Sequence, residues 1–149
     1  LVLIVIALFS VFNCVQAADI EARTGIMGGD VWGLHAGAYI NFPQSRLFSI
    51  QTGLLLHTAG NSFSYGDDWN IDFFVPVYAS FHIPLSDKVN LRLNAGAYTG
   101  SGEYWNLGAT AAAGIEVKRF YVGVNYFQNC VNDRDLKLGL SVGYKFTLF

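Results

Sequence analysis

The stretch LKLGLSVGYKF, residues 136–146, alternates without exception between two kinds of side chain. One face carries only large apolar or aromatic residues, which are Leu136, Leu138, Leu140, Val142, Tyr144 and Phe146. The opposite face carries Lys137, Gly139, Ser141, Gly143 and Lys145. Because successive side chains of a β-strand point to opposite faces, this period of two predicts a strand with one apolar face and one polar face.

The same alternation recurs after residue 18, and no stretch there has the period of an amphipathic helix. We therefore predict an all-β protein with eight strands. They cover residues 20–27, 31–42, 47–58, 71–83, 89–98, 107–117, 120–127 and 136–146. The first strand has the weakest pattern, because its segment EARTGIMGGD is short and rich in glycine.

The predicted connections alternate in length. PQSR (43–46), PLSDK (84–88) and KR (118–119) are short, whereas AGNSFSYGDDWN (59–70), TGSGEYWN (99–106) and QNCVNDRD (128–135) are longer. Bacterial outer-membrane barrels have short periplasmic turns and longer external loops. An even strand number also places both chain ends on the side of the short turns. The pattern predicts a transmembrane, antiparallel, up-and-down β-barrel of about eight strands.

A soluble secreted barrel that binds an apolar ligand would show the same period, with the apolar faces turned inward. Two features favour the membrane barrel. Charged residues make up only 13% of the chain, about half the usual share, and the polar faces are rich in Gly, Ser, Asn and Tyr. Aromatic residues gather near the predicted strand ends, where the interfacial girdles of a membrane barrel lie.

The first segment predicts export. LVLIVIALFSVF (1–12) is apolar, and Val15 and Ala17 are small residues at the −3 and −1 positions of a cleavage site. A membrane-spanning helix needs about 20 apolar residues, more than this segment has. We predict a signal peptide over residues 1–18, cut after Ala17 or Ala18, and a barrel domain over residues 19–149.

Composition excludes several classes of function. The formal net charge of −2, without a basic block, predicts no nucleic-acid partner. After cleavage only Cys130 remains, so we expect neither an intrachain disulfide nor a cysteine-based metal site.

Several of the alternating segments together resemble a known family. These are GLHAGAYINF (33–42), LFSIQTGLLLH (47–57), FFVPVYASFHIPL (73–85), LRLNAGAYTG (91–100) and LKLGLSVGYKF. They resemble the outer-membrane β-barrel domain family of small porin-like proteins, which includes OmpX-like and OmpA-type barrels of Gram-negative bacteria and is abundant in Bacteroidetes. The resemblance implies an integral protein surrounded by outer-membrane lipid and lipopolysaccharide. It also implies that the barrel-assembly machinery reads the C-terminal strand, at Phe146 or Phe149.

The side chains predicted to point into the barrel carry nearly balanced charges. They include Glu21, Arg23, His35, Gln51, His57, Asp72, His82, Asn90, Arg92, Asn94, Glu116, Asn125, Lys137 and Lys145. An eight-stranded barrel is only just wide enough for its side chains, so we expect ion pairs and hydrogen bonds to fill the lumen. A narrow porin-like channel is the alternative, although wide channels belong to barrels of about 16 strands.

An enzymatic alternative arises from the histidines. A serine, a histidine and an acid can cleave an ester, and Ser49, Ser80, Asp72 and Glu116 accompany the three histidines, as a lipid A-modifying deacylase or acyltransferase would require. The predicted strands place His82 near a periplasmic turn and His57 near an external loop, far from each other. The same spacing argues against a metal site at His35, His57 and His82. We therefore predict no catalytic residue, no cofactor and no metal.

The external loops offer the other route to function. The segment GNSFSYGDDWN (60–70) places Asp67 and Asp68 beside aromatic residues, a combination that contacts a cation, a glycan or a host surface in some proteins. We predict a non-enzymatic outer-membrane barrel with a structural, adhesion or surface-recognition role.

Overall fold

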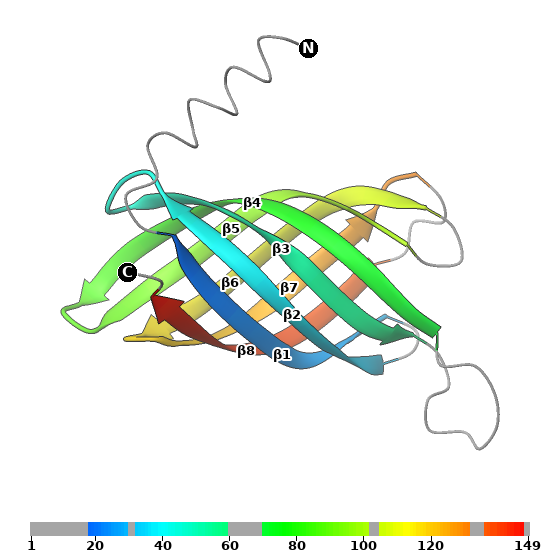
Figure 1. Ribbon diagram of the computed structural model, residues 1–149, viewed down its shortest axis with the longest axis horizontal. Coiled ribbons are helices and arrows are strands. Elements are labelled where there is room, and N and C mark those ends of the chain that lie inside the picture. Colours follow the sequence, from blue (N-terminus) through cyan, green and yellow to red (C-terminus); the bar gives the residue numbers. More distant parts are fainter. Residues whose placement is uncertain (1–17, 30–31, 60–69, 102–104, 132–135, 148–149) are drawn as a thin grey trace, which may run out of the picture.

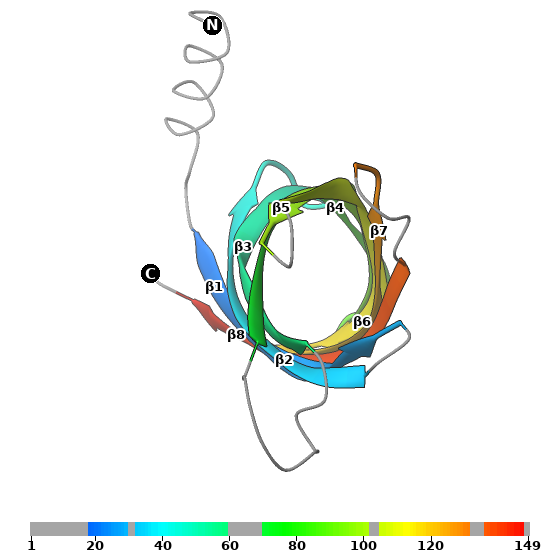
Figure 2. The ribbon, with the colours of Figure 1, turned by 90° about the vertical axis from the view of Figure 1, so that its right-hand side faces the viewer.

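The computed structural model describes residues 18–29, 32–59, 70–101, 105–131 and 136–147. Eight β-strands form in this part of the chain: β1 (Asp19–Gly28), β2 (Trp32–Pro43), β3 (Phe48–Ala59), β4 (Asn70–Ser86), β5 (Val89–Gly100), β6 (Asn106–Val117), β7 (Phe120–Asn129) and β8 (Leu136–Thr147). Each strand pairs antiparallel with its sequence neighbours, and β1 also pairs with β8. The sheet is therefore a closed barrel, seen from the side in Figure 1 and as a ring in Figure 2.

All eight predicted strands are present, and the predicted fold class is confirmed. The first strand, with the weakest pattern, pairs with β2 and β8 along its whole length. β4 continues past the predicted end at Ile83, because a register shift between Pro84 and Ser86 accommodates the proline, which has no N–H to donate. The predicted start of the second strand, Val31, the signal peptide segment 1–17 and Phe149 lie outside the described residues.

The two ends of the barrel differ, as the alternating connection lengths predict. The short connections β2–β3, β4–β5 and β6–β7 lie at one end together with Asp19 and Thr147, where the described part of the chain begins and ends its strands (Figure 1). We call this the turn end. The strand ends that border the other four connections lie at the opposite end, which we call the loop end. The segment 60–69, with Asp67 and Asp68, is outside the described residues.

The apolar faces of the strands point away from the barrel axis. On β8, Leu136, Leu138, Leu140 and Val142 are 42–53% exposed, whereas Ser141 on the opposite face is 1% exposed. Other strands follow the same rule, and large apolar side chains form a continuous outer surface. The soluble alternative, which needs the apolar faces inside, is wrong.

Exposed aromatic side chains lie at both ends of this apolar surface. Trp32 and Trp105 are 53% and 62% exposed beside the loop end, and Phe120 and Phe146 are 62% and 49% exposed beside the turn end. Amphipathic aromatic rings prefer the boundary between hydrocarbon and water. Their positions are those of two interfacial girdles. The described part of the chain contains no helix that is long and apolar enough to cross a membrane.

Candidate functional site: the barrel lumen

The lumen is divided into a charged half and an apolar half. Near the turn end, Glu21, Arg23, Arg92 and Glu116 point inward and are at most 4% exposed. Toward the loop end, the buried cluster consists of Met27, Leu55, Phe74, Tyr98 and Phe127. The other side chains that the sequence predicts to point inward also do so, at various heights along the barrel. His35, Gln51, His57, Asn94 and Asn125 are buried, and Asp72, His82, Asn90, Lys137 and Lys145 are partly exposed.

Arg92 is the centre of the charged half. Its guanidinium donates to both carboxylate oxygens of Glu21, at 2.7 and 2.9 Å, and to Oε1 of Glu116 at 2.5 Å. Arg23 also donates to Glu21 through Nε, and Lys145 Nζ lies 3.4 Å from Glu116 Oε2. Three cations therefore surround two carboxylates. A buried charge needs such compensation, because removing it from water costs several kcal/mol.

Tyrosine rings complete this layer. The Tyr121 ring contacts both guanidinium groups, with its centroid 4.5 Å from Arg23 Cζ and 3.9 Å from Arg92 Cζ. Arg23 also lies over the Tyr39 ring at 4.2 Å. Gly114 and Gly123 make room for Tyr121, since a Cβ atom at either position would overlap its ring or hydroxyl. The ion pairs that the sequence predicts are therefore present in this layer, and cation–ring contacts that it does not predict accompany them.

One arrangement near the turn end has the atom order of a hydrolytic triad. Ser49 Oγ lies 2.9 Å from His82 Nε2, and His82 Nδ1 lies 3.5 Å from Glu116 Oε1. In serine hydrolases one ring nitrogen accepts the serine proton while the other donates to an acid. The sequence does not predict that these three side chains come together, because they lie on three different strands, β3, β4 and β6. The expected separation of His57 is confirmed, since it pairs with His35 toward the loop end.

The surroundings of these three groups do not suit ester cleavage. Ser49 is only 1% exposed, whereas a reacting carbonyl carbon must come within about 3.5 Å of the nucleophilic oxygen. The Ser49 hydroxyl also lies 3.0 Å from Asn41 Oδ1, which competes with His82 for its proton. Glu116 is shared with Arg92 and Lys145. The geometry is that of a buried hydrogen-bond network.

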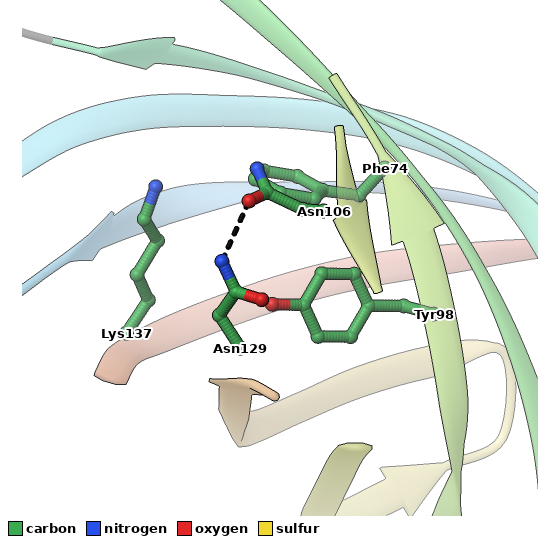
Figure 3. A pocket seen from close by; sticks show the side chains of 5 residues that line it. All are labelled: Phe74, Tyr98, Asn106, Asn129 and Lys137. Atoms are coloured by element: carbon green, nitrogen blue, oxygen red, sulfur yellow. Dashed lines mark hydrogen bonds between the residues drawn. The ribbon is translucent and has the colours of Figure 1, made fainter. Parts of the chain in front are cut away.

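The loop end has a small cavity. Phe74 and Tyr98 form one side, Asn106 and Asn129 are joined by a 2.6 Å hydrogen bond, and Lys137 completes the lining (Figure 3). Lys137 Nζ lies 5.3 Å from the centroid of the Phe74 ring and 4.0 Å from Asp72 Oδ2. The volume of about 20 Å³ is enough for roughly one water molecule. It is too small for an organic ligand.

The two histidines of the apolar half have partners within the barrel. His57 Nε2 lies 2.9 Å from the Met27 carbonyl oxygen, and His35 Nε2 lies 3.2 Å from Ser141 Oγ. Within the described segments, no three His, Cys, Asp or Glu side chains are grouped so that they could hold a metal ion. Cys130 is a free, exposed thiol.

Comparison with known proteins identifies the fold. No family model matches the chain, and no curated protein matches its sequence. The N-terminal β-barrel domain of Pseudomonas aeruginosa OprF is similar with a TM-score of 0.57 at 13% identity, over 88% of this chain and 98% of that one. The Yersinia pestis outer membrane protein Ail is similar with a TM-score of 0.54 at 13% identity, over 87% and 99%. The fold is that of the outer-membrane barrels.

A designed protein has the same fold. A structure from the de novo design of transmembrane β-barrels is similar with a TM-score of 0.55 at 16% identity, over 87% of this chain and 95% of that one. Because a designed chain shares only the physical pattern, the outer-membrane barrel fold by itself carries no function. The narrower resemblance to OmpX-like proteins of Bacteroidetes stays a prediction.

Proposed function

We propose that this chain is a non-enzymatic integral protein of the bacterial outer membrane with a structural, adhesion or surface-recognition role. The observation that carries the proposal is the inverted barrel, which has an apolar outer surface and a charged, filled lumen. Soluble monomers rarely expose apolar patches larger than a few hundred Å². A lipid bilayer is the solvent in which this surface is stable.

The strand lengths fit that solvent. A tilted transmembrane β-strand needs about 9–11 residues, and the strands here have 10 to 17. The closed ring also leaves no strand edge with unpaired backbone groups, which hydrocarbon would not tolerate. By the usual rule of connection lengths, the turn end faces the periplasm and the loop end faces outward.

A structural or recognition role fits the filled lumen better than transport does. In support, Arg23 and Arg92 both contact Tyr121 within the lumen, and the cavity at the loop end has room for about one water molecule. Recognition would then use the external connections. Ail is by its name an attachment and invasion locus protein, and we extend an attachment role to this chain on fold analogy alone.

The partners follow from the same proposal. Membrane lipid would cover the apolar surface, with lipopolysaccharide on the outer side. The barrel-assembly machinery would recognise the C-terminal strand. The predicted signal peptide over residues 1–18 is tested by the mass of the exported protein.

A second candidate function rests on the order of Ser49, His82 and Glu116, which is that of a hydrolase. A fluorophosphonate probe, which labels activated serines, separates the two functions. Labelling that is lost in Ser49→Ala would establish the hydrolase. We expect no labelling, because Ser49 is buried.

Cell fractionation tests the main proposal. The chain would be produced with its N-terminal segment in a Gram-negative host, and the outer-membrane fraction run on gels with and without boiling. A folded membrane barrel is expected in the outer-membrane fraction and to change mobility on boiling. A soluble protein without a mobility change would refute the proposal.

A further inference from the structure

We propose that the turn end binds the phosphate group of an anionic phospholipid, through a cationic cluster formed by Lys88, Lys118 and Arg119. The inference rests on the proposed function, because it places the turn end at the periplasmic leaflet. All three residues are exposed and lie in the short β4–β5 and β6–β7 connections.

Backbone contacts bring the two cationic turns together. The Lys118 N–H donates to the Lys88 carbonyl oxygen at 3.2 Å, next to the Val89–Val117 pair that joins β5 to β6. Arg119 follows Lys118 directly, and its carbonyl oxygen accepts the Lys145 N–H at 2.8 Å. Three cationic side chains therefore start from one small area of the rim, and this area is held by the strand ladder.

The conformation of Lys118 is unfavourable for a lysine. Its φ is 57°, and among the described residues it is the one non-glycine residue with a positive φ. A residue with a Cβ atom is strained in this left-handed region, where glycine or asparagine is usual. Repulsion between neighbouring cations adds to the cost. The left-handed conformation closes the two-residue β6–β7 hairpin, but it does not call for a lysine, and no described ion pair relieves the repulsion between the cations. The choice of cations therefore points to a ligand outside the chain.

The cationic groups of the cluster form no ion pair within the described part of the chain. No described carboxylate forms an ion pair with Lys88, Lys118 or Arg119, whereas Lys145 is engaged by Glu116 in the lumen. Asp87 is the one acid in the short connections at this end. The cluster therefore keeps an excess of positive charge for an anion.

The neighbouring outer surface favours a lipid over free phosphate. Phe120 follows Arg119 directly, and its ring meets Tyr144 edge-on at 5.0 Å, while Tyr144 meets Phe146 at 4.9 Å. Val117, just before Lys118, also faces outward and is 44% exposed. Aromatic rings mark the headgroup level of a bilayer. A phospholipid can place its phosphate at the cations and its acyl chains along these rings, whereas inorganic phosphate uses only the cations.

Native mass spectrometry of the folded full chain in detergent tests the site. The protein would be offered equal amounts of phosphatidylglycerol and phosphatidylcholine, and the retained lipids counted. The wild type is expected to retain phosphatidylglycerol preferentially. Lys118→Asn should reduce its apparent affinity about fivefold, the usual effect of one cation near an anionic headgroup. The same variant should unfold no more easily than the wild type, because asparagine tolerates the left-handed conformation.

Arg46→Asn is the matched control. Arg46 is an exposed cation of the β2–β3 turn and has no second cation in that turn with which to share a phosphate, so its loss should reduce phosphatidylglycerol retention less than twofold. Equal retention of the two lipids, or equal losses in the two variants, would overturn the inference. Displacement by inorganic phosphate at the lipid's concentration would overturn the assignment to a lipid. The same preparation would be tested in vesicles for a mobility change on boiling. If that change is present and lipid preference is absent, the lipid site has failed and the membrane proposal has not.

Discussion

Replacing Leu140 by arginine tests the membrane-facing surface most directly. Leu140 lies near the middle of β8, on the outward face, and is 53% exposed. Its partners on the adjacent strands, Ile26 and Val124, are 43% and 51% exposed. If water covered this surface, the substitution would change the free energy of unfolding by no more than about 0.5 kcal/mol. At the midplane of a bilayer it should cost about 2–4 kcal/mol.

Leu136→Arg is the matched control, because Leu136 lies on the same face of the same strand but at the loop end. The cost of a lipid-facing arginine falls to about 0–1 kcal/mol near the interface. The two variants should therefore differ by at least about 1 kcal/mol. Leu140→Ala separates the loss of packing from the cost of the charge.

The measurement is denaturant unfolding of the barrel in phospholipid vesicles, with the folded fraction read from gel mobility without boiling. Equal costs for Leu140→Arg and Leu136→Arg, or costs below about 0.5 kcal/mol for both, would refute the membrane assignment. From the sequence pattern, Gly139→Ala on the lumen face should cost far less than Leu140→Arg. It is not a neutral control, because a Cβ atom there would lie 2.9 Å from the Ile26 carbonyl oxygen and 3.1 Å from Met27 Cβ.

Three further results are expected. Arg92→Met should lower the free energy of unfolding by about 3–5 kcal/mol in the same assay, because it removes the buried cation that compensates Glu21 and Glu116. A smaller loss than that of Lys145→Met, at the partly exposed rim, would count against the network. The wild type should show no steady conductance in a planar bilayer, and regular open-channel steps would disprove the filled lumen. Ser49→Ala should leave membrane insertion unchanged, and impaired insertion would mean that its hydroxyl is needed for assembly.

Much of the barrel could be predicted from local sequence. Strand positions and faces depend on the alternation of neighbouring side chains, as in Leu138, Gly139 and Leu140, and this needs no knowledge of distant residues. The one clear error in extent, the end of β4, comes from a proline that a local rule treats as a terminator and a register shift tolerates.

The candidate sites could not be predicted in the same way. The faces of the strands predict which side chains point into the lumen, but they do not predict which of these side chains contact each other. Glu21 and Arg92 are separated by 71 residues, and Ser49 and His82 by 33. The meeting of Ser49 and His82 depends on the register between β3 and β4, and that of Glu21 and Arg92 on the stagger of the strands around the closed ring. A single strand carries no record of either.

By itself, then, the sequence determined the eight strands, the division of each strand into an apolar and a polar face, and the difference between the two ends, because these are periodic and local properties. The tertiary structure decided that the apolar faces point outward, that Tyr121 contacts both Arg23 and Arg92, that Ser49 meets His82, and that Lys88 and Lys118 share one rim. The Ser49 and Lys88 contacts depend on the register between neighbouring strands, β3 with β4 and β5 with β6. The contact of Tyr121 with Arg23 exists only after the last strand pairs with the first, when closure fixes which inward side chains lie at the same height in the barrel.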